Sequence, residues 1–159
     1  MTAPDFSGDI KFRLSAQSGK VIVMAVQAMS DQWARAISLK LNDISNAPHK
    51  GRVLPILVFA DVTGTNSNFD RLANLLKLKS NMLVKVEPAK FFSLYDIDTK
   101  SGISPQVLFI IDGSRVIRFR ADNNSLQNIK SKKFIDTLTK LVPGVDWQNI
   151  LNPQSNGKK

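Results

Sequence analysis

Two nearly continuous apolar runs predict the first strands of the chain. Residues 20–27 read KVIVMAVQ and residues 53–60 read VLPILVFA. Strands that are covered on both faces of a sheet have this composition, whereas half-exposed strands alternate apolar and polar residues. A third and shorter run, Met82–Val86, predicts another strand. We therefore expect a sheet whose inner strands are buried on both sides.

Apolar residues at helical spacing occupy the stretches between these runs. Four large apolar residues from Trp33 to Ile44 recur every three or four positions and predict a helix, which Ser30 can cap with its hydroxyl. The same spacing predicts a second helix over Phe69–Leu78 and a third over Ala89–Ile97. The first half of the chain thus alternates strand and helix.

The pattern changes after residue 105. Two strands, Gln106–Ile111 and Arg115–Ala121, are separated by the turn signal Asp112–Gly113, which predicts a β-hairpin. Ser125–Val142 then predicts one helix or a broken pair, with Ser131 able to cap the second part. Alternating strand–helix units form parallel sheets, and a terminal hairpin adds an antiparallel edge. The sequence predicts an α/β fold with a mixed central sheet of about five strands and helices on both faces.

The length of 159 residues suits one domain. We expect residues 1–19 to be an N-terminal extension, residues 20–151 to be the domain and residues 152–159 to be a disordered polar tail. Within the extension, the alternating stretch Ile10–Leu14 predicts an additional edge strand. The first residues lack a signal-peptide pattern, and no apolar run has the length of a transmembrane helix.

The most informative chemical feature of the sequence is that it contains no cysteine. This absence excludes disulfides, cysteine nucleophiles and thiolate metal sites. The single histidine, His49, lies in a stretch with Pro and Gly, and we expect it to be a solvated loop residue. The aspartates Asp61, Asp70, Asp96 and Asp98 do not have the spacing of a calcium loop. The sequence therefore predicts no catalytic residue, no cofactor and no metal site.

The segment Gly102–Pro105, followed by QVLFIIDGSRVIRFRA, carries a resemblance to a known fold. Together with the element order it resembles the thioredoxin superfamily, in which a cis-proline precedes a strand, a glycine-containing turn and a last strand. The resemblance covers about residues 20–142 and implies a cis peptide at Pro105. It also places the family's redox motif after the second strand, where Asp61–Asn66 contains no cysteine. The resemblance implies a redox-inactive member.

Three short segments resemble one branch of that superfamily, the TrbC-like pilus-assembly proteins of F-type conjugative systems. They are Ala28–Asp31, Glu87–Phe92 and Gly102–Pro105. The chain departs from the branch in lacking a proline after Met29 and in a longer insertion at Asp98–Ser101. This resemblance implies a component or assembly factor of a conjugative or type IV secretion machine, working in the periplasm. The alternative location is the cytoplasm.

The resemblance also implies a groove for a protein partner. Redox members hold substrate peptides beside the cis-proline, and a cysteine-free member can keep that groove for binding. The loops beyond the carboxyl ends of parallel strands form a natural crevice. The expected partner-binding residues are Met29, Ser30, Asp61, Val62, Thr63, Gly64, Ser104 and Pro105.

A net charge of +9 leaves a different kind of partner open. Such a balance favours acidic partners, including nucleic acid, which is our second choice after a protein. The candidate basic patch comprises Arg115, Arg118, Arg120, Lys130, Lys132 and Lys133. Alternation along the last strand predicts that its two arginines point away from the core, where charged side chains also protect an open sheet edge. We favour edge protection over a binding role.

Overall fold

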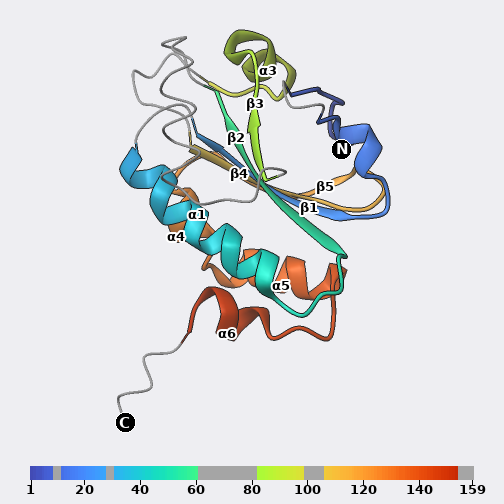
Figure 1. The fold of residues 1–159 in the computed structure, drawn as a ribbon, viewed down its shortest axis with the longest axis vertical. Coiled ribbons are helices and arrows are strands. Elements are labelled where there is room, and N and C mark those ends of the chain that lie inside the picture. The colour runs from blue at the N-terminus through green and yellow to red at the C-terminus, as the bar shows by residue number, and fades with distance from the viewer. Residues whose placement is uncertain (9–11, 28–30, 61–81, 99–105, 154–159) are drawn as a thin grey trace.

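A five-stranded mixed sheet forms the centre of the molecule (Figure 1). The computed structural model describes residues 1–8, 12–27, 31–60, 82–98 and 106–153. The strands are β1 (Val21–Gln27), β2 (Val53–Phe59), β3 (Leu83–Lys85), β4 (Gln106–Ile111) and β5 (Ile117–Ala121), in the order β3-β2-β1-β4-β5. β1, β2 and β3 are parallel, whereas β4 is antiparallel to β1 and β5 to β4. The α/β fold and the hairpin are confirmed.

Helices cover both faces of the sheet (Figure 1). One face carries α1 (Asp31–Asn46), α4 (Ser125–Asn128), α5 (Lys132–Leu141) and α6 (Trp147–Leu151). The other face carries α3 (Pro88–Leu94) and the N-terminal segment, residues 1–8 and 12–17, which ends in the 3-10 helix η1 (Leu14–Gln17). The predicted helix over 69–78 and the predicted cis peptide at Pro105 lie outside the described residues.

β1 shows why the sequence forms a two-sided core. All seven of its residues are buried. Val21, Val23 and Ala25 pack toward α1 and α5, while the alternate residues from Ile22 to Val26 pack toward α3 and the N-terminal segment. Because successive side chains of a strand point to opposite faces, an unbroken apolar run fills both layers at once.

Local capping divides the C-terminal helical stretch as the sequence predicts. The Ser131 hydroxyl accepts a hydrogen bond from the Phe134 N–H at 3.2 Å, which begins α5 after the short α4. The sequence analysis missed α6, whose Asp146 carboxylate accepts the Asn149 N–H at 3.1 Å. α6 holds Trp147, which is 1% exposed and donates its indole N–H to the Val142 carbonyl at 3.0 Å.

The expectation that His49 is solvated is wrong, since its exposed fraction is 5%. Its Nε2 lies 2.9 Å from the Ile44 carbonyl oxygen, and its Nδ1 accepts the Val53 N–H at 3.4 Å. A carbonyl can only accept, so this pairing fits a proton on Nε2. The ring also stacks on Trp147, with the centroids 6.2 Å apart. His49 therefore closes the loop between α1 and β2 from within the core.

The N-terminal segment packs across the sheet. Ala3 is fully buried and Phe6 is 7% exposed. Thr2 forms an antiparallel bridge with Val116, next to the start of β5. The edge strand predicted over Ile10–Leu14 does not form as such: Arg13 makes an isolated bridge with Ser7 and Leu14 begins η1, while residues 10 and 11 lie outside the described part.

Candidate functional site

The ends of β1 and β2 and the start of β4 lie together at one end of the sheet. Gln27 at the end of β1 pairs with Gln106 at the start of β4. The Ala60 N–H, just after β2, donates to the Gln27 carbonyl at 2.9 Å. The residues that directly flank the predicted groove segments are therefore neighbours. The groove residues themselves, Met29, Ser30, Asp61, Val62, Thr63, Gly64, Ser104 and Pro105, lie outside the described residues.

Two glutamines stand at this edge, and the sequence analysis did not single them out. Gln27 is 2% exposed and continues the side of β1 that faces α1, and its partner Gln106 lies on the same side of β4. Neither side-chain amide forms a hydrogen bond to another described residue. A buried amide needs a partner, and an amide can both donate to and accept from a peptide backbone. A polar residue at the end of an otherwise apolar strand is the sequence signal that could have identified them.

The sheet order shows which strand lies beside β4. β1, not β2, pairs with β4. Residues 28–30 thus follow a strand that pairs with β4, whereas Asp61–Asn66 follow β2, which is one strand further from β4 in the sheet. Neither stretch contains cysteine. Disulfide exchange requires a cysteine thiolate, so it is excluded at both positions.

Each arginine of the candidate basic patch has a carboxylate partner. Arg118 Nε lies 2.6 Å from the Asp112 carboxylate, and Arg120 Nε lies 2.7 Å from that of Asp122. Arg115 NH1 lies 3.9 Å from Asp5 Oδ1. These pairs reduce the positive charge that β5 and its turn present to a partner.

Arg120 lies closer to the core than strand alternation alone suggests. Its side chain is 28% exposed, its guanidinium lies 5.2 Å from the centroid of the Phe109 ring, and it donates to the Tyr95 carbonyl at 2.7 Å and the Asp96 carbonyl at 2.9 Å. Arg120 thus joins the edge strand to the end of α3. A register shift near Ile110 adds a bulge in the β4–β5 pairing. Bulges and charged residues both discourage edge pairing, which supports edge protection.

The six cations of the candidate patch do not share one face. Arg118 and Arg120 flank Phe119, which packs toward α5, so their side chains leave the opposite side of the strand. Lys132 and Lys133 begin α5, on the face that Phe119 occupies, and Lys130 lies in the turn just before that helix. Lys132 pairs with Asp136 at 2.6 Å.

The turn before β5 is organised by Asp112. Its carboxylate accepts the N–H groups of Ser114 and Val116, both at 2.9 Å, in addition to the Arg118 contact. Burial by itself would raise the pKa of Asp112, but the Val116 N–H, the Arg118 side chain and the Ser114 N–H outweigh it and hold that pKa below its usual value. Because the Asp112 carboxylate accepts N–H groups as far as Val116, the turn extends to that residue. β5 therefore begins at Ile117, two residues later than the sequence predicts.

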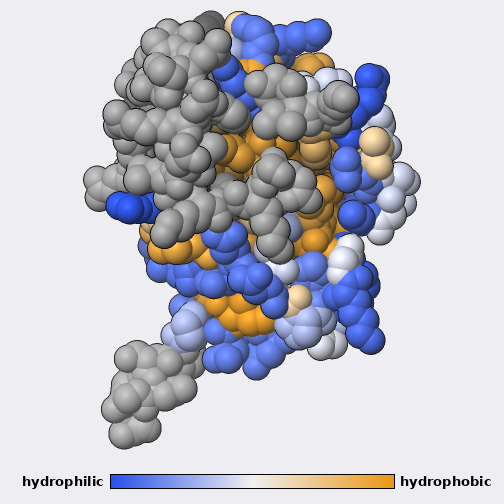
Figure 2. Space-filling view, in the orientation of Figure 1, coloured by the Kyte–Doolittle hydropathy of each residue, from blue (hydrophilic) through white to orange (hydrophobic). Residues whose placement is uncertain are grey.

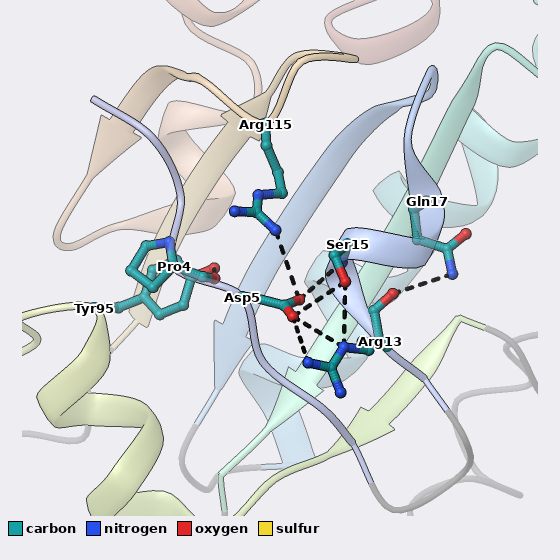
Figure 3. Close-up of polar contacts among 7 residues, drawn as sticks. All are labelled: Pro4, Asp5, Arg13, Ser15, Gln17, Tyr95 and Arg115. Carbon is teal, nitrogen blue, oxygen red and sulfur yellow. Dashed lines mark hydrogen bonds and ion pairs between the residues drawn. The ribbon is translucent and has the colours of Figure 1, made fainter.

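A second polar cluster joins the N-terminal segment to the sheet (Figure 3). Asp5 Oδ2 lies 2.9 Å from both Nε and NH2 of Arg13, and Asp5 Oδ1 accepts the Ser15 N–H at 2.8 Å. Burial would raise the pKa of Asp5, but the Ser15 hydrogen bonds and Arg13 lower it overall. The Tyr95 hydroxyl donates to the Pro4 carbonyl at 2.6 Å, and burial raises the pKa of that hydroxyl.

Two further features of the described part of the chain bear on function. Within it, no group of three or more acidic or histidine side chains is arranged to hold a metal ion. Over the same residues, no helix combines the length and the apolar character that crossing a bilayer requires.

The comparisons with known proteins bear on the fold alone. No protein-family model and no curated protein matches the chain. Among solved structures, the chain is similar to the thioredoxin domain of a thiol-disulfide oxidoreductase from Bacteroides vulgatus, with a TM-score of 0.67, 15% identity and coverage of 89% of this chain and 96% of that one. A thiol:disulfide interchange protein from a Bacteroides species gives a TM-score of 0.64, 18% identity and coverage of 90% and 89%. The exposed lipoprotein thioredoxin of Streptococcus pneumoniae gives a TM-score of 0.59, 14% identity and coverage of 87% and 98%.

These likenesses extend over almost the whole of both chains at low identity. Two of the proteins are described by their thiol–disulfide chemistry, and the third as a thioredoxin, whereas this chain has no cysteine with which to perform such chemistry. The chain has a thioredoxin-like fold that lacks the thiols of redox exchange.

Proposed function

We propose that this protein is a non-catalytic interaction module that binds a protein partner. The observation that carries the proposal is the complete absence of cysteine in a thioredoxin-like fold. Without a thiolate, neither a mixed disulfide nor its resolution is possible. What the fold retains is a set of loops at the carboxyl edge of a parallel sheet, which is where α/β folds bind their ligands.

The proposed contact surface is the groove framed by Met29–Ser30, Asp61–Gly64 and Ser104–Pro105. Its support is the adjacency of Gln27, Ala60 and Gln106, from which these segments leave the sheet. In Figure 2 apolar side chains are open to view in the band beside the grey segments, whereas the margins of this face are hydrophilic. An extended peptide that passes there would find apolar surface and the half-buried side chain of Gln106.

The finer proposal is that the partner belongs to a conjugative or type IV secretion machine and that the domain works in its pilus assembly, in the periplasm. The resemblance of Ala28–Asp31, Glu87–Phe92 and Gly102–Pro105 to TrbC-like proteins supports this assignment. The order of neighbouring genes tests it directly, because a pilus-assembly operon is expected around this one. Neighbours that encode only unrelated functions would remove the support for the finer assignment and leave the interaction module.

The groove is tested by a photo-crosslinking amino acid placed at Thr63 in the native host, with the same group at Lys133 as the matched control. Position 63 should yield a crosslink to one assembly protein that position 133 does not yield. The Thr63→Arg variant should then weaken binding of the purified partner, whereas Arg118→Gln, which leaves the contacts of Arg120 in place, should not. Lost binding in Arg118→Gln alone would move the interface to the sheet edge.

A second candidate function is nucleic-acid binding, which the net charge of +9 favours. A salt titration separates the two, because each phosphate contact makes affinity fall with salt concentration. Retention of a random-sequence DNA duplex that weakens by about a thousandfold between 50 and 200 mM salt would favour this candidate. Because the arginines of β5 are paired with carboxylates, we expect no such binding.

A further inference from the structure

A pocket separate from the proposed groove lies between the N-terminal segment and α3. Its volume is about 380 Å³, within the range of small-ligand sites. Described residues from both elements line it: Asp5, Phe6, Ser7, Arg13, Val86, Glu87, Lys90, Phe91 and Leu94. None of these residues belongs to the groove set, so the pocket stands independently of the proposed function.

The apolar part of the pocket is exposed to solvent on one side. Phe6 and Phe91 are 7% and 2% exposed, and their rings meet edge to face with centroids 4.9 Å apart. Leu94, by contrast, is 40% exposed, one of three large apolar side chains left open in the described part of the chain. The two rings thus form a fixed base, and Leu94 offers surface that a ligand's apolar group can cover.

The two acids of the pocket are already occupied within the protein. The Asp5 carboxylate is held by Arg13 and Ser15 (Figure 3). The Glu87 carboxylate accepts the N–H groups of Ala89 at 3.3 Å and Lys90 at 2.7 Å, which caps α3. Neither acid is available to attract a cation without breaking these contacts.

The cations of the pocket keep hydrogen-bonding capacity. The Lys90 side chain is exposed and contacts no carboxylate of the described residues. Arg13, whose side chain is 62% exposed, uses Nε and NH2 on Asp5 and leaves NH1 for another acceptor. A site that combines apolar surface with available cationic donors selects a ligand in which a carboxylate lies close to a bulky apolar group.

We propose that this pocket binds an extended protein segment in which a large apolar side chain is followed by an acidic residue. The apolar side chain covers Leu94 above the Phe6 and Phe91 rings, and the carboxylate pairs with Lys90 and Arg13. The overall charge of +9 favours approach of such an acidic segment.

The test uses three blocked dipeptides on the full chain labelled with nitrogen-15: N-acetyl-Phe-Asp-amide, its neutral isostere N-acetyl-Phe-Asn-amide, and N-acetyl-Ala-Asp-amide. Phe-Asp should give saturable shifts of the amide signals of Phe6, Glu87 and Leu94. Both other dipeptides should bind more weakly, the Asn dipeptide by about two- to fivefold, which is the range of an exposed ion pair. Shifts that do not saturate, shifts that appear elsewhere, or equal affinity for the Asp and Asn dipeptides would overturn the proposal.

Matched variants test whether Lys90 is the cation that contacts the ligand carboxylate. Lys90→Gln should lower the affinity for the Phe-Asp dipeptide by about two- to fivefold and leave the affinity for the Phe-Asn dipeptide unchanged. Lys133 is an exposed lysine on the opposite face, and Lys133→Gln should change neither affinity. Unchanged affinity in Lys90→Gln, with a thermal midpoint equal to that of the wild type, would contradict the assignment. A parallel titration with 3-phenylpropanoate examines the ligand class. Binding tighter than that of Phe-Asp would assign the pocket to small carboxylic acids and overturn the protein-segment proposal.

Discussion

Replacing His49 by alanine should be among the most damaging substitutions that avoid the apolar core. The change removes the hydrogen bond at 2.9 Å to the Ile44 carbonyl and the longer one at 3.4 Å from the Val53 N–H. It also removes the stacking on Trp147. A buried polar group left without a partner costs about 1–3 kcal/mol, and an aromatic pair contributes about 0.5–1.5 kcal/mol. We expect a loss of about 3 kcal/mol in the free energy of unfolding.

Urea unfolding followed by circular dichroism measures this loss, and a chain of this size should also melt about 6–12 °C lower. Two partial replacements divide the effect. His49→Gln can restore a donor toward the Ile44 carbonyl, and His49→Asn can restore an acceptor for the Val53 N–H. Because the hydrogen bond to the Ile44 carbonyl is the shorter, His49→Gln should be more stable than His49→Asn. Both variants should have a larger free energy of unfolding than His49→Ala.

The exposed neighbour Lys50 supplies the control. Lys50→Gln changes a solvent-facing side chain of the same loop and should shift the free energy of unfolding by less than about 0.5 kcal/mol. A loss below about 1 kcal/mol in His49→Ala, or the reverse order of the Gln and Asn variants, would refute the assigned role of the imidazole.

Three further predictions concern other parts of the molecule. Asp112→Asn should lower the free energy of unfolding by about 1–2 kcal/mol at pH 7. Since the pKa of Asp112 is lower in the folded chain, its contribution is present above about pH 4 and is lost as the pH falls through the folded value, so the variant should lose less between pH 5 and 3 in urea titrations. Gly8→Ala should cost about 1–3 kcal/mol, because a Cβ at this position would collide with the Val84 side chain, and an unchanged thermal midpoint would contradict that packing. The purified protein should not accelerate insulin reduction by dithiothreitol above the uncatalysed rate, and turnover in a preparation free of other oxidoreductases would overturn the proposed lack of redox function.

Sequence patterns predicted the elements well because burial on both faces leaves a strong signal. The apolar runs of β1 and β2 and the helical spacing of α1 required no tertiary information. The Ser131 cap was equally readable, since the hydrogen bond is local. These features depend on residues close together in the chain.

What the sequence could not show depends on distant contacts. Composition places His49 in a loop, and only the stacking against Trp147, almost a hundred residues later, explains its burial. The order of strands is similarly non-local, so the position of β1 beside β4, and the meeting of Gln27 with Gln106, could not be read from the sequence. The pairing of Arg118 with Asp112 also depends on the turn geometry that the bulged hairpin adopts.

The path of the N-terminal segment bears on the order in which the protein can fold. The Ala3 N–H donates to the Arg115 carbonyl at 2.7 Å, and the Ile117 N–H donates to the Met1 carbonyl at 2.8 Å. These partners are synthesised more than a hundred residues apart, so the segment remains without them until the last hairpin has left the ribosome. Contacts of such long range slow folding, and the apolar surface that Ala3 and Phe6 later cover stays open in the meantime. The apolar side chains of Ala3 and Phe6 are therefore accessible to chaperones in the nascent chain until Phe91, Tyr95 and the last hairpin have been synthesised.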